Sequence, residues 1–202
     1  MFTSRRAYRL AAAVIALSLS AATVEAQTTT WYAELTGTAE SPPNASPGSG
    51  FGVFTYDAAA HTFSYYVTFQ DSLGTTTAAH IHCCELNPVT NTAGVATTTP
   101  SFVGFPLGVT AGSFITTLDL TLATSWNATF ITNNGGTTAA AEAVFINGIN
   151  SGNAYFNIHT SVFGGGEIRG TLTVVPEPST LLLTAAGLIA AGFVARRRTR
   201  AA

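Results

Sequence analysis

The stretch FGVFTYDAAAHTFSYYVTF, residues 51–69, contains the clearest structural signal in the sequence. Its two arms, Phe51–Tyr56 and Thr62–Phe69, are rich in aromatic and β-branched residues, which favour strands. The short segment between them, Asp57–His61, has the length and composition of a turn. We therefore predict an antiparallel β-hairpin over residues 51–69.

Strands of the same kind are predicted on both sides of this hairpin, and within residues 27–175 only Thr138–Ile149 has a helical pattern. About eight short strands and one short helix predict an all-β fold, an antiparallel β-sandwich. The further predicted strands are Trp31–Leu35, Ala78–Cys84, Phe114–Leu122, Ala154–Thr160 and Glu167–Val174, the last two joined by a turn at Gly164–Gly166. In Phe114–Leu122, four residues are predicted to face the core: Ile115, Leu118, Leu120 and Leu122.

The charges are distributed unevenly along the 202 residues. Seven of the eight basic residues lie near the two ends, whereas residues 27–175 contain only Arg169 and eight carboxylates, a net charge of −7. A segment with one cation cannot neutralise a run of phosphates, which argues against nucleic-acid binding. No glycine-rich loop precedes a lysine, so a nucleotide-phosphate site of that type is not expected either.

The N-terminus, residues 1–26, has the three parts of a secretory signal peptide. A basic start, an apolar core over Leu10–Leu19 and a small-residue end predict cleavage after Ala26. The alternative is a membrane anchor, for which the apolar run is too short. Ser4–Tyr8 also matches part of a twin-arginine export signal. The segment that follows, residues 27–175, is predicted to be one exported domain.

The C-terminus, residues 176–202, combines a Pro-Glu-Pro motif, an apolar segment over Leu181–Ala195 and an arginine cluster. The apolar segment predicts a helix that is a marginal membrane span, so a retained tail anchor is the alternative. In this order the three parts resemble the PEP-CTERM sorting signal. The resemblance implies an exosortase-type processing enzyme, transient membrane insertion, and export to the cell envelope, surface or extracellular matrix of a Gram-negative bacterium. The residues that carry it are Pro176, Glu177, Pro178, Arg196, Arg197 and Arg198.

The segment His80–Cys84 suggests a metal site. Side chains alternate along a strand, so His80, His82 and, if the strand continues that far, Cys84 share one face. His159, on a later predicted strand, could approach the pair. Imidazole and thiolate ligands suit copper or zinc. The alternative is that the histidines only form hydrogen bonds with neighbouring loops.

Glu167 and Arg169 share a face of the last predicted strand. They could form a structural ion pair, or Glu167 could be a carboxylate that orients a metal-bound histidine.

The chain has two cysteines, Cys83 and Cys84, which are adjacent. In an exported protein they could pair with each other, pair with another chain or stay reduced. Neighbouring residues of a strand point apart, so a disulfide between them would be strained and easily reduced.

Motifs spread over residues 33–172 resemble the CHRD domain, which is named after chordin and widespread in exported bacterial proteins. The resemblance implies an immunoglobulin-like β-sandwich and no established enzyme class. The His-x-His strand is also similar to the copper-binding strand of copper–zinc superoxide dismutases, but residues 88–106 contain no His, Asp or Glu for a zinc subsite. The matching motifs are Ala33–Gly37 with Glu40–Pro43, Gly50–Gly52, Ala79–His82, Gly152–Thr160 and Gly166–Leu172.

These features predict an exported, non-catalytic binding module of the surface or the exopolysaccharide matrix of a biofilm, with exopolysaccharide or surface proteins as partners. The alternative is a copper- or zinc-binding protein with redox chemistry at the His-x-His strand. A hydrolase is not expected, because the chain has no Gly-x-Ser-x-Gly motif and no evident pair of carboxylates.

Overall fold

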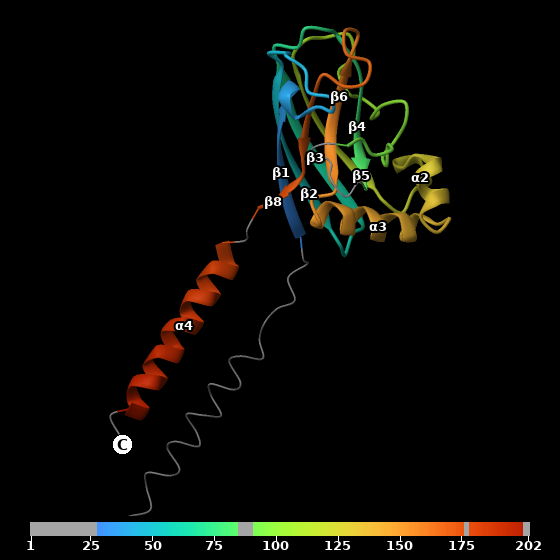
Figure 1. Cartoon of the computed structure of the whole chain (residues 1–202). Helices are drawn as coiled ribbons and strands as arrows, with labels where there is room; N and C mark the ends of the chain where they lie inside the picture. Colours follow the sequence, from blue (N-terminus) through green and yellow to red (C-terminus); the bar gives the residue numbers. More distant parts are fainter. Residues whose placement is uncertain (1–27, 85–90, 176–177, 200–202) are drawn as a thin grey trace, which may run out of the picture.

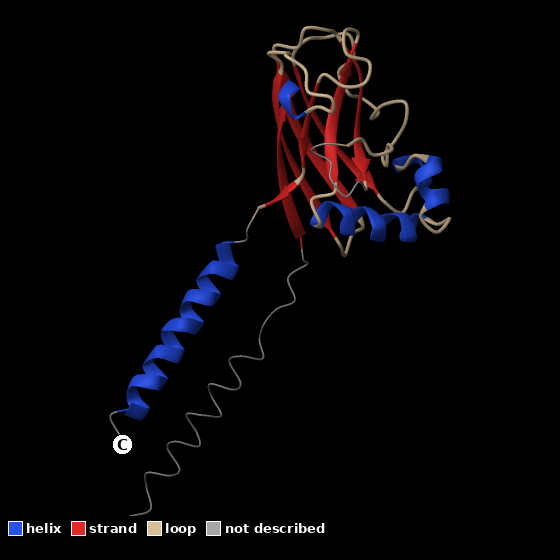
Figure 2. Cartoon of the chain, in the orientation of Figure 1, coloured by secondary structure: helices blue, strands red, loops and turns tan. Residues whose placement is uncertain are grey.

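The computed structural model describes residues 28–84, 91–175 and 178–199. The predicted signal peptide with its cleavage site at Ala26, and Pro176 and Glu177 of the tail, lie outside the described residues. The described part consists mainly of antiparallel strands with few helices (Figures 1 and 2). The prediction of an all-β antiparallel fold is therefore confirmed.

The eight strands of the described residues form one hydrogen-bonded sheet. Its order is β4-β6-β7-β1-β2-β3-β5, and β8 pairs with β1. The hairpin predicted over residues 51–69 is present as β2 and β3, which pair in continuous register from Ser49–Gln70 to Asp57–Thr62. The strands are β1 (Thr28–Thr36), β2 (Ser49–Asp57), β3 (Thr62–Gln70), β4 (Thr76–Cys83), β5 (Gly112–Asp119), β6 (Ala154–Thr160), β7 (Ile168–Thr171) and β8 (Thr173–Val174).

The sheet curves so that its two halves face each other across an apolar core. The ring of Phe54 on β2 lies 5.6 Å from that of Phe156 on β6, although β7 and β1 stand between these two strands in the sheet order. Trp31 and Phe63 are fully buried beside them, and burial of such rings is the main stabilising contribution to the fold. The two layers expected of a sandwich are thus halves of one sheet, joined where β7 meets β1.

The segment 91–111 covers the free edge of β4. The Ala96 N–H donates to the Ile81 carbonyl at 2.9 Å, so this edge is not open for pairing with another chain. Phe102 and Phe105 of the same segment are buried in the core. The long connection is therefore part of the packed structure and also lies next to the outer face of β4.

Two α-helices follow β5, and the sequence pattern predicts only the second of them. α2 (Ala128–Asn133) has six residues, too few for a helical period to be recognised. α3 (Thr138–Asn150) is the predicted helix, and its N-terminus is capped by Thr137, which accepts a hydrogen bond from the Ala140 N–H. Two 3₁₀ turns, η1 (Gly37–Ala39) and η2 (Ala123–Ser125), complete the domain.

The residues of β5 that face the core differ from those predicted. Phe114 is buried, whereas Ile115 is 74% exposed and lies on the outer face. Leu118 and Leu120 do face the core, but Leu122 is exposed because the strand ends at Asp119 and the chain turns there. The prediction is wrong for Ile115 and Leu122, since apolar residues stand on both faces of this strand and conceal its alternation.

The tail forms a helix, α4 (Pro178–Thr199), that leads away from the sheet (Figure 1). Among the described residues, no helix has both the length and the mean hydropathy that a membrane crossing requires. Transient membrane insertion of the tail stays a prediction.

We expect Gly148→Ala in α3 to lower the free energy of unfolding by about 1–3 kcal/mol. A Cβ at this position would overlap both sulfur atoms of a disulfide between Cys83 and Cys84, which lies against the helix. At an unobstructed helical position, replacing Gly by Ala stabilises the fold by roughly 0.5–1 kcal/mol. The sign of the change in unfolding free energy therefore shows whether the position is obstructed. Urea unfolding measures the change, with Asn147→Ala, an exposed neighbour, as the control. Equal or greater stability of the Gly148 variant would contradict this packing.

Candidate metal centre

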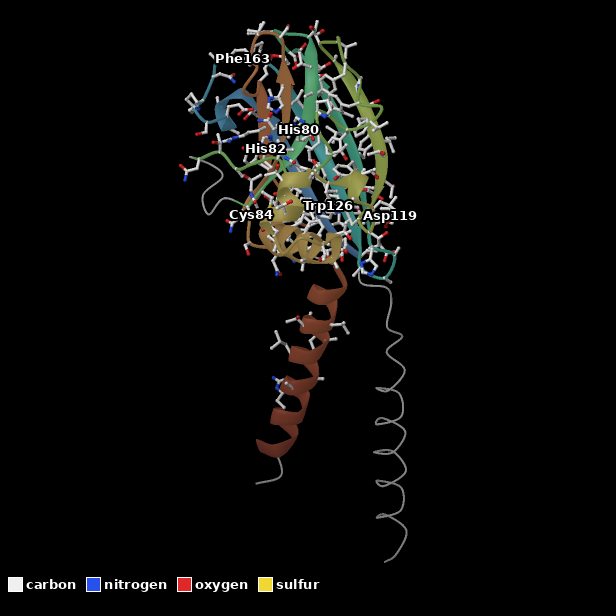
Figure 3. All side chains as sticks on the ribbon, turned by 90° about the vertical axis from the view of Figure 1, so that its right-hand side faces the viewer. His80, His82, Cys84, Asp119, Trp126 and Phe163 are labelled. Carbon is white, nitrogen blue, oxygen red and sulfur yellow. A yellow bond between two sulfur atoms is a disulfide. The ribbon has the colours of Figure 1, made fainter. Side chains whose placement is uncertain are left out.

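Three histidines come together on the outer face of β4 and β6. His80 and His82 point away from the core because the alternate residues of β4 point into it. The antiparallel register places His159 opposite Ala78, next to the pair. One ring nitrogen from each histidine lies within 4.8 Å of the other two. Figure 3 labels His80 and His82 close to each other.

Each imidazole uses its other nitrogen to donate a hydrogen bond to a backbone carbonyl. His80 Nε2 contacts the Pro100 oxygen at 2.6 Å. His82 Nδ1 contacts the Ala93 oxygen at 2.8 Å, and His159 Nδ1 contacts the Gly164 oxygen at 3.0 Å. A carbonyl can only accept, so these nitrogens carry the hydrogens and the tautomers are fixed.

The three remaining ring nitrogens are buried and have no hydrogen-bond partner: His80 Nδ1, His82 Nε2 and His159 Nε2. A buried acceptor without a partner costs free energy, and three of them in one place need an explanation. Three lone pairs that converge, each on a ring oriented by a second hydrogen bond, are the arrangement that a divalent metal ion requires. The donor set therefore fits a copper or zinc ion.

Burial lowers the pKa of all three histidines. The effect is largest for His82, whose pKa falls to about 4, because burial outweighs the opposing hydrogen bond to the Ala93 carbonyl. At neutral pH all three rings are therefore uncharged, which is the form that coordinates metals.

An aromatic and cationic stack supports His82 from the side. The ring of Tyr155 lies parallel to that of His82, with centroids 4.8 Å apart. The Arg169 guanidinium lies over the Tyr155 ring, 4.5 Å from its centroid. The Tyr155 hydroxyl also accepts a hydrogen bond from the Ala93 N–H, so one tyrosine positions both the imidazole and the residue whose carbonyl holds it.

Arg169 has partners other than the one that the sequence suggested. Its guanidinium donates to the carbonyls of Ala39 and Asn91, and its Nε lies 3.8 Å from a carboxylate oxygen of Glu40. Glu40 also accepts a hydrogen bond from Asn157. Burial raises the pKa of Glu40 to about 7 despite the nearby arginine.

Glu167 is not paired with Arg169 and does not contact the histidines. Its carboxylate accepts hydrogen bonds from the hydroxyls of Ser46 and Thr160 and from the N–H groups of Leu73 and Gly74. Burial alone would raise its pKa, but these hydrogen bonds outweigh burial and lower it. Glu167 thus neither pairs with Arg169 nor orients a histidine. Its role is structural, because it precedes β7 and its carboxylate binds the adjoining loops.

Cys84 does not join the three histidines. β4 ends at Cys83, so the alternation that would bring Cys84 to their face stops one residue earlier. Its sulfur is bonded to that of Cys83 and lies against α3, near the Val144 carbonyl. The structure therefore contains the vicinal disulfide, and Cys84 has no thiolate to offer a metal.

Tyr155 and the three carbonyls are parts of the site that the sequence analysis misses. Tyr155 could have been found, because it stands at even spacing from His159 on the same strand and must share its face. The carbonyls of Ala93, Pro100 and Gly164 belong to loops, and no sequence pattern places them.

Two family models match this sequence. One, described as the CHRD domain, covers residues 31–172. The other, described as the PEP-CTERM protein-sorting motif, covers residues 174–198. No curated protein and no solved structure matches the chain.

The pKa of His82 predicts a pH dependence of stability for the metal-free protein. The unfolded state binds the His82 proton near pH 6.5 and the folded state near pH 4, so the contribution is lost as the pH falls through this window. We expect His82→Asn to gain about 3 kcal/mol in unfolding free energy relative to the unmutated chain between pH 7 and 4.

Denaturant unfolding at several pH values measures this difference. Glu40 has a raised pKa, so its contribution to stability increases as the pH falls, opposite to that of His82. This contribution is the same in both proteins and cancels in the comparison. A constant difference between the two proteins across the window would contradict a neutral, buried His82.

Proposed function

Because this chain belongs to the CHRD-domain family, and because a PEP-CTERM motif marks it as an exported, exosortase-processed protein of a Gram-negative cell envelope or surface, we propose that its domain is a transition-metal-binding module. The ion would be copper or zinc, held by His80, His82 and His159. The observation that supports this most strongly is the set of three buried ring nitrogens without hydrogen-bond partners.

The ligand set supports one ion with three protein nitrogens. Imidazole nitrogens suit copper and zinc better than the oxygen-preferring magnesium or calcium. The cluster of potential ligands found among the described residues contains no carboxylate, so any further position on the ion would be filled by water or a small molecule. The hydrogen bonds to loop carbonyls keep the rings in place before the ion arrives, which reduces the entropic cost of binding.

We propose that the site binds and does not catalyse. His80 and His82 are buried, and the free ring nitrogens of all three histidines are shielded from solvent. A site covered in this way favours retention of an ion over exchange of a substrate. Retention in an exopolysaccharide matrix, and transient insertion of the tail into the membrane, are the finer parts of this proposal.

Metal titration of the full chain after chelation tests the proposal. We expect one Cu²⁺ or Zn²⁺ per chain, and loss of at least about 100-fold in affinity in His82→Asn, His159→Asn and His80→Gln, which is more than the loss of an outer hydrogen-bond partner costs. The amides in these variants can keep the hydrogen bond to each carbonyl while the metal-facing nitrogen is removed. Calorimetry and elemental analysis measure affinity and stoichiometry.

His61→Asn is the matched control, since His61 is the fourth histidine of the chain and lies in the β2–β3 turn, hydrogen-bonded to Glu142. Equal binding by the control and by the three cluster variants would overturn the proposed site. Absence of binding in a chain with native stability would overturn the function.

Replacement of Pro176, Glu177 and Pro178 by alanine should block removal of the tail in a host with an exosortase-type enzyme. We expect the chain to keep the mass of residues 176–202, which intact mass spectrometry of the cell-envelope fraction detects. Thr180→Ala, just outside the motif, is the control. Normal processing of the triple variant would show that another segment carries the sorting signal.

A further inference from the structure

The outer face of the other half of the sheet carries a row of exposed apolar side chains. Tyr32 on β1, Val53 on β2, Tyr66 on β3 and Ile115 on β5 stand opposite one another in the strand register. Tyr32, Tyr66 and Ile115 are 36%, 47% and 74% exposed. Phe51, 42% exposed, stacks on Tyr32 with centroids 6.3 Å apart. We name these five residues the aromatic row.

Polar residues, uncharged apart from Glu34, flank the aromatic row on both sides. On one side the Ser64 and Thr117 hydroxyls are hydrogen-bonded at 2.9 Å. The register aligns four hydroxyl side chains there: Thr30, Thr55, Ser64 and Thr117. On the other side Phe51 is aligned with Thr68, and next to them an open groove of about 330 Å³ is lined by residues that include Ser49 and Gln70. The face therefore offers flat rings for stacking and hydroxyl and amide groups for hydrogen bonds.

The charge on this face decides which partner it fits. Across the aromatic row and the aligned positions beside it, Glu34 is the one side chain that carries a charge at neutral pH. A membrane surface, a nucleic acid or an acidic polymer would need cations here, and there are none. The complementary ligand is uncharged, carries many hydroxyls and has apolar C–H faces, which is the chemistry of a neutral polysaccharide.

The spacing of the rings fits the same ligand. Tyr32 and Tyr66 are two strands apart, which is about 10 Å at the usual distance between neighbouring strands. This matches the length of one disaccharide unit of an extended chain, so both rings could stack on the same polymer. An exposed apolar patch of this kind on an exported protein also requires a reason to persist, since it carries a risk of aggregation.

We propose that the aromatic row binds a neutral, β-linked polysaccharide, which lies across β1, β2 and β3. Sugar rings stack on Tyr32 and Tyr66, and their hydroxyls bond to the flanking Ser, Thr and Gln side chains. This binding does not depend on the metal centre, which lies on β4 and β6 at the other half of the sheet.

Retention of the purified full chain on insoluble cellulose, xylan and curdlan tests the proposal, with alginate as an acidic comparison. We expect retention on at least one neutral polymer and not on alginate. The double variant Tyr32→Ser/Tyr66→Ser should bind at least tenfold more weakly. Tyr32→Phe/Tyr66→Phe keeps the rings and should retain binding, and Val162→Ser, an exposed apolar residue on another loop, is the matched control.

The proposal is overturned if none of the three neutral polymers retains the chain, or if the double serine variant, with unchanged unfolding midpoint, binds as well as the unmutated chain. A concentration-dependent dimer that the same variant abolishes, without retention on any polymer, would assign the face to a second copy and also overturn it. His82→Asn, which removes a proposed metal ligand, should leave retention unchanged, so the two proposals succeed or fail separately.

Discussion

The architecture around the three-histidine cluster depends on one buried anion, the carboxylate of Glu167. It accepts hydrogen bonds from three separate segments: Ser46, the Leu73–Gly74 backbone, and Thr160 at the end of β6. A buried charge is tolerated only when its hydrogen-bonding capacity is filled, so each segment must be in place for the others to be stable. The loop between Thr160 and Glu167 contains Gly164, whose carbonyl orients His159. The orientation of His159, a candidate metal ligand, thus depends on a carboxylate that does not contact it.

The two halves of the sheet use their outer faces differently. β4 and β6 are buried on both sides, with apolar residues inside and histidines, Tyr155 and Asn157 outside under the loops. β2, β3 and β5 leave their outer faces to solvent. A strand buried on both faces places polar residues where water cannot satisfy them, so their partners must come from the protein. The carbonyls of the long segment 91–111 supply two of those partners, which gives this segment a role beyond connecting two strands.

Local sequence patterns were sufficient for the hairpin, for β6, for α3 and for the common face of His80 and His82. They failed where the deciding interaction is distant in sequence or where a pattern is concealed. The sequence pattern places Ile115 in the core because an apolar residue on an exposed face of a strand looks the same in sequence as a core residue. The ion pair of Arg169 with Glu40 joins residues that are far apart in the chain. Glu167 is a nearer carboxylate in sequence, and strand alternation places it on the same face as Arg169. Cys84 was placed beside the histidines because alternation was extended one residue beyond the end of the strand.

The disulfide at the end of β4 joins residues that are adjacent in sequence, and it therefore closes no loop of chain. A cross-link stabilises a protein mainly by restricting its unfolded chain, to an extent that grows with the enclosed loop. A bond between neighbours leaves the unfolded ensemble almost as free as before. The stability of the domain therefore comes mainly from its non-covalent contacts, and the disulfide adds little to it by restricting the unfolded chain. The oxidation state of its cysteines would instead record which side of the inner membrane the protein has reached.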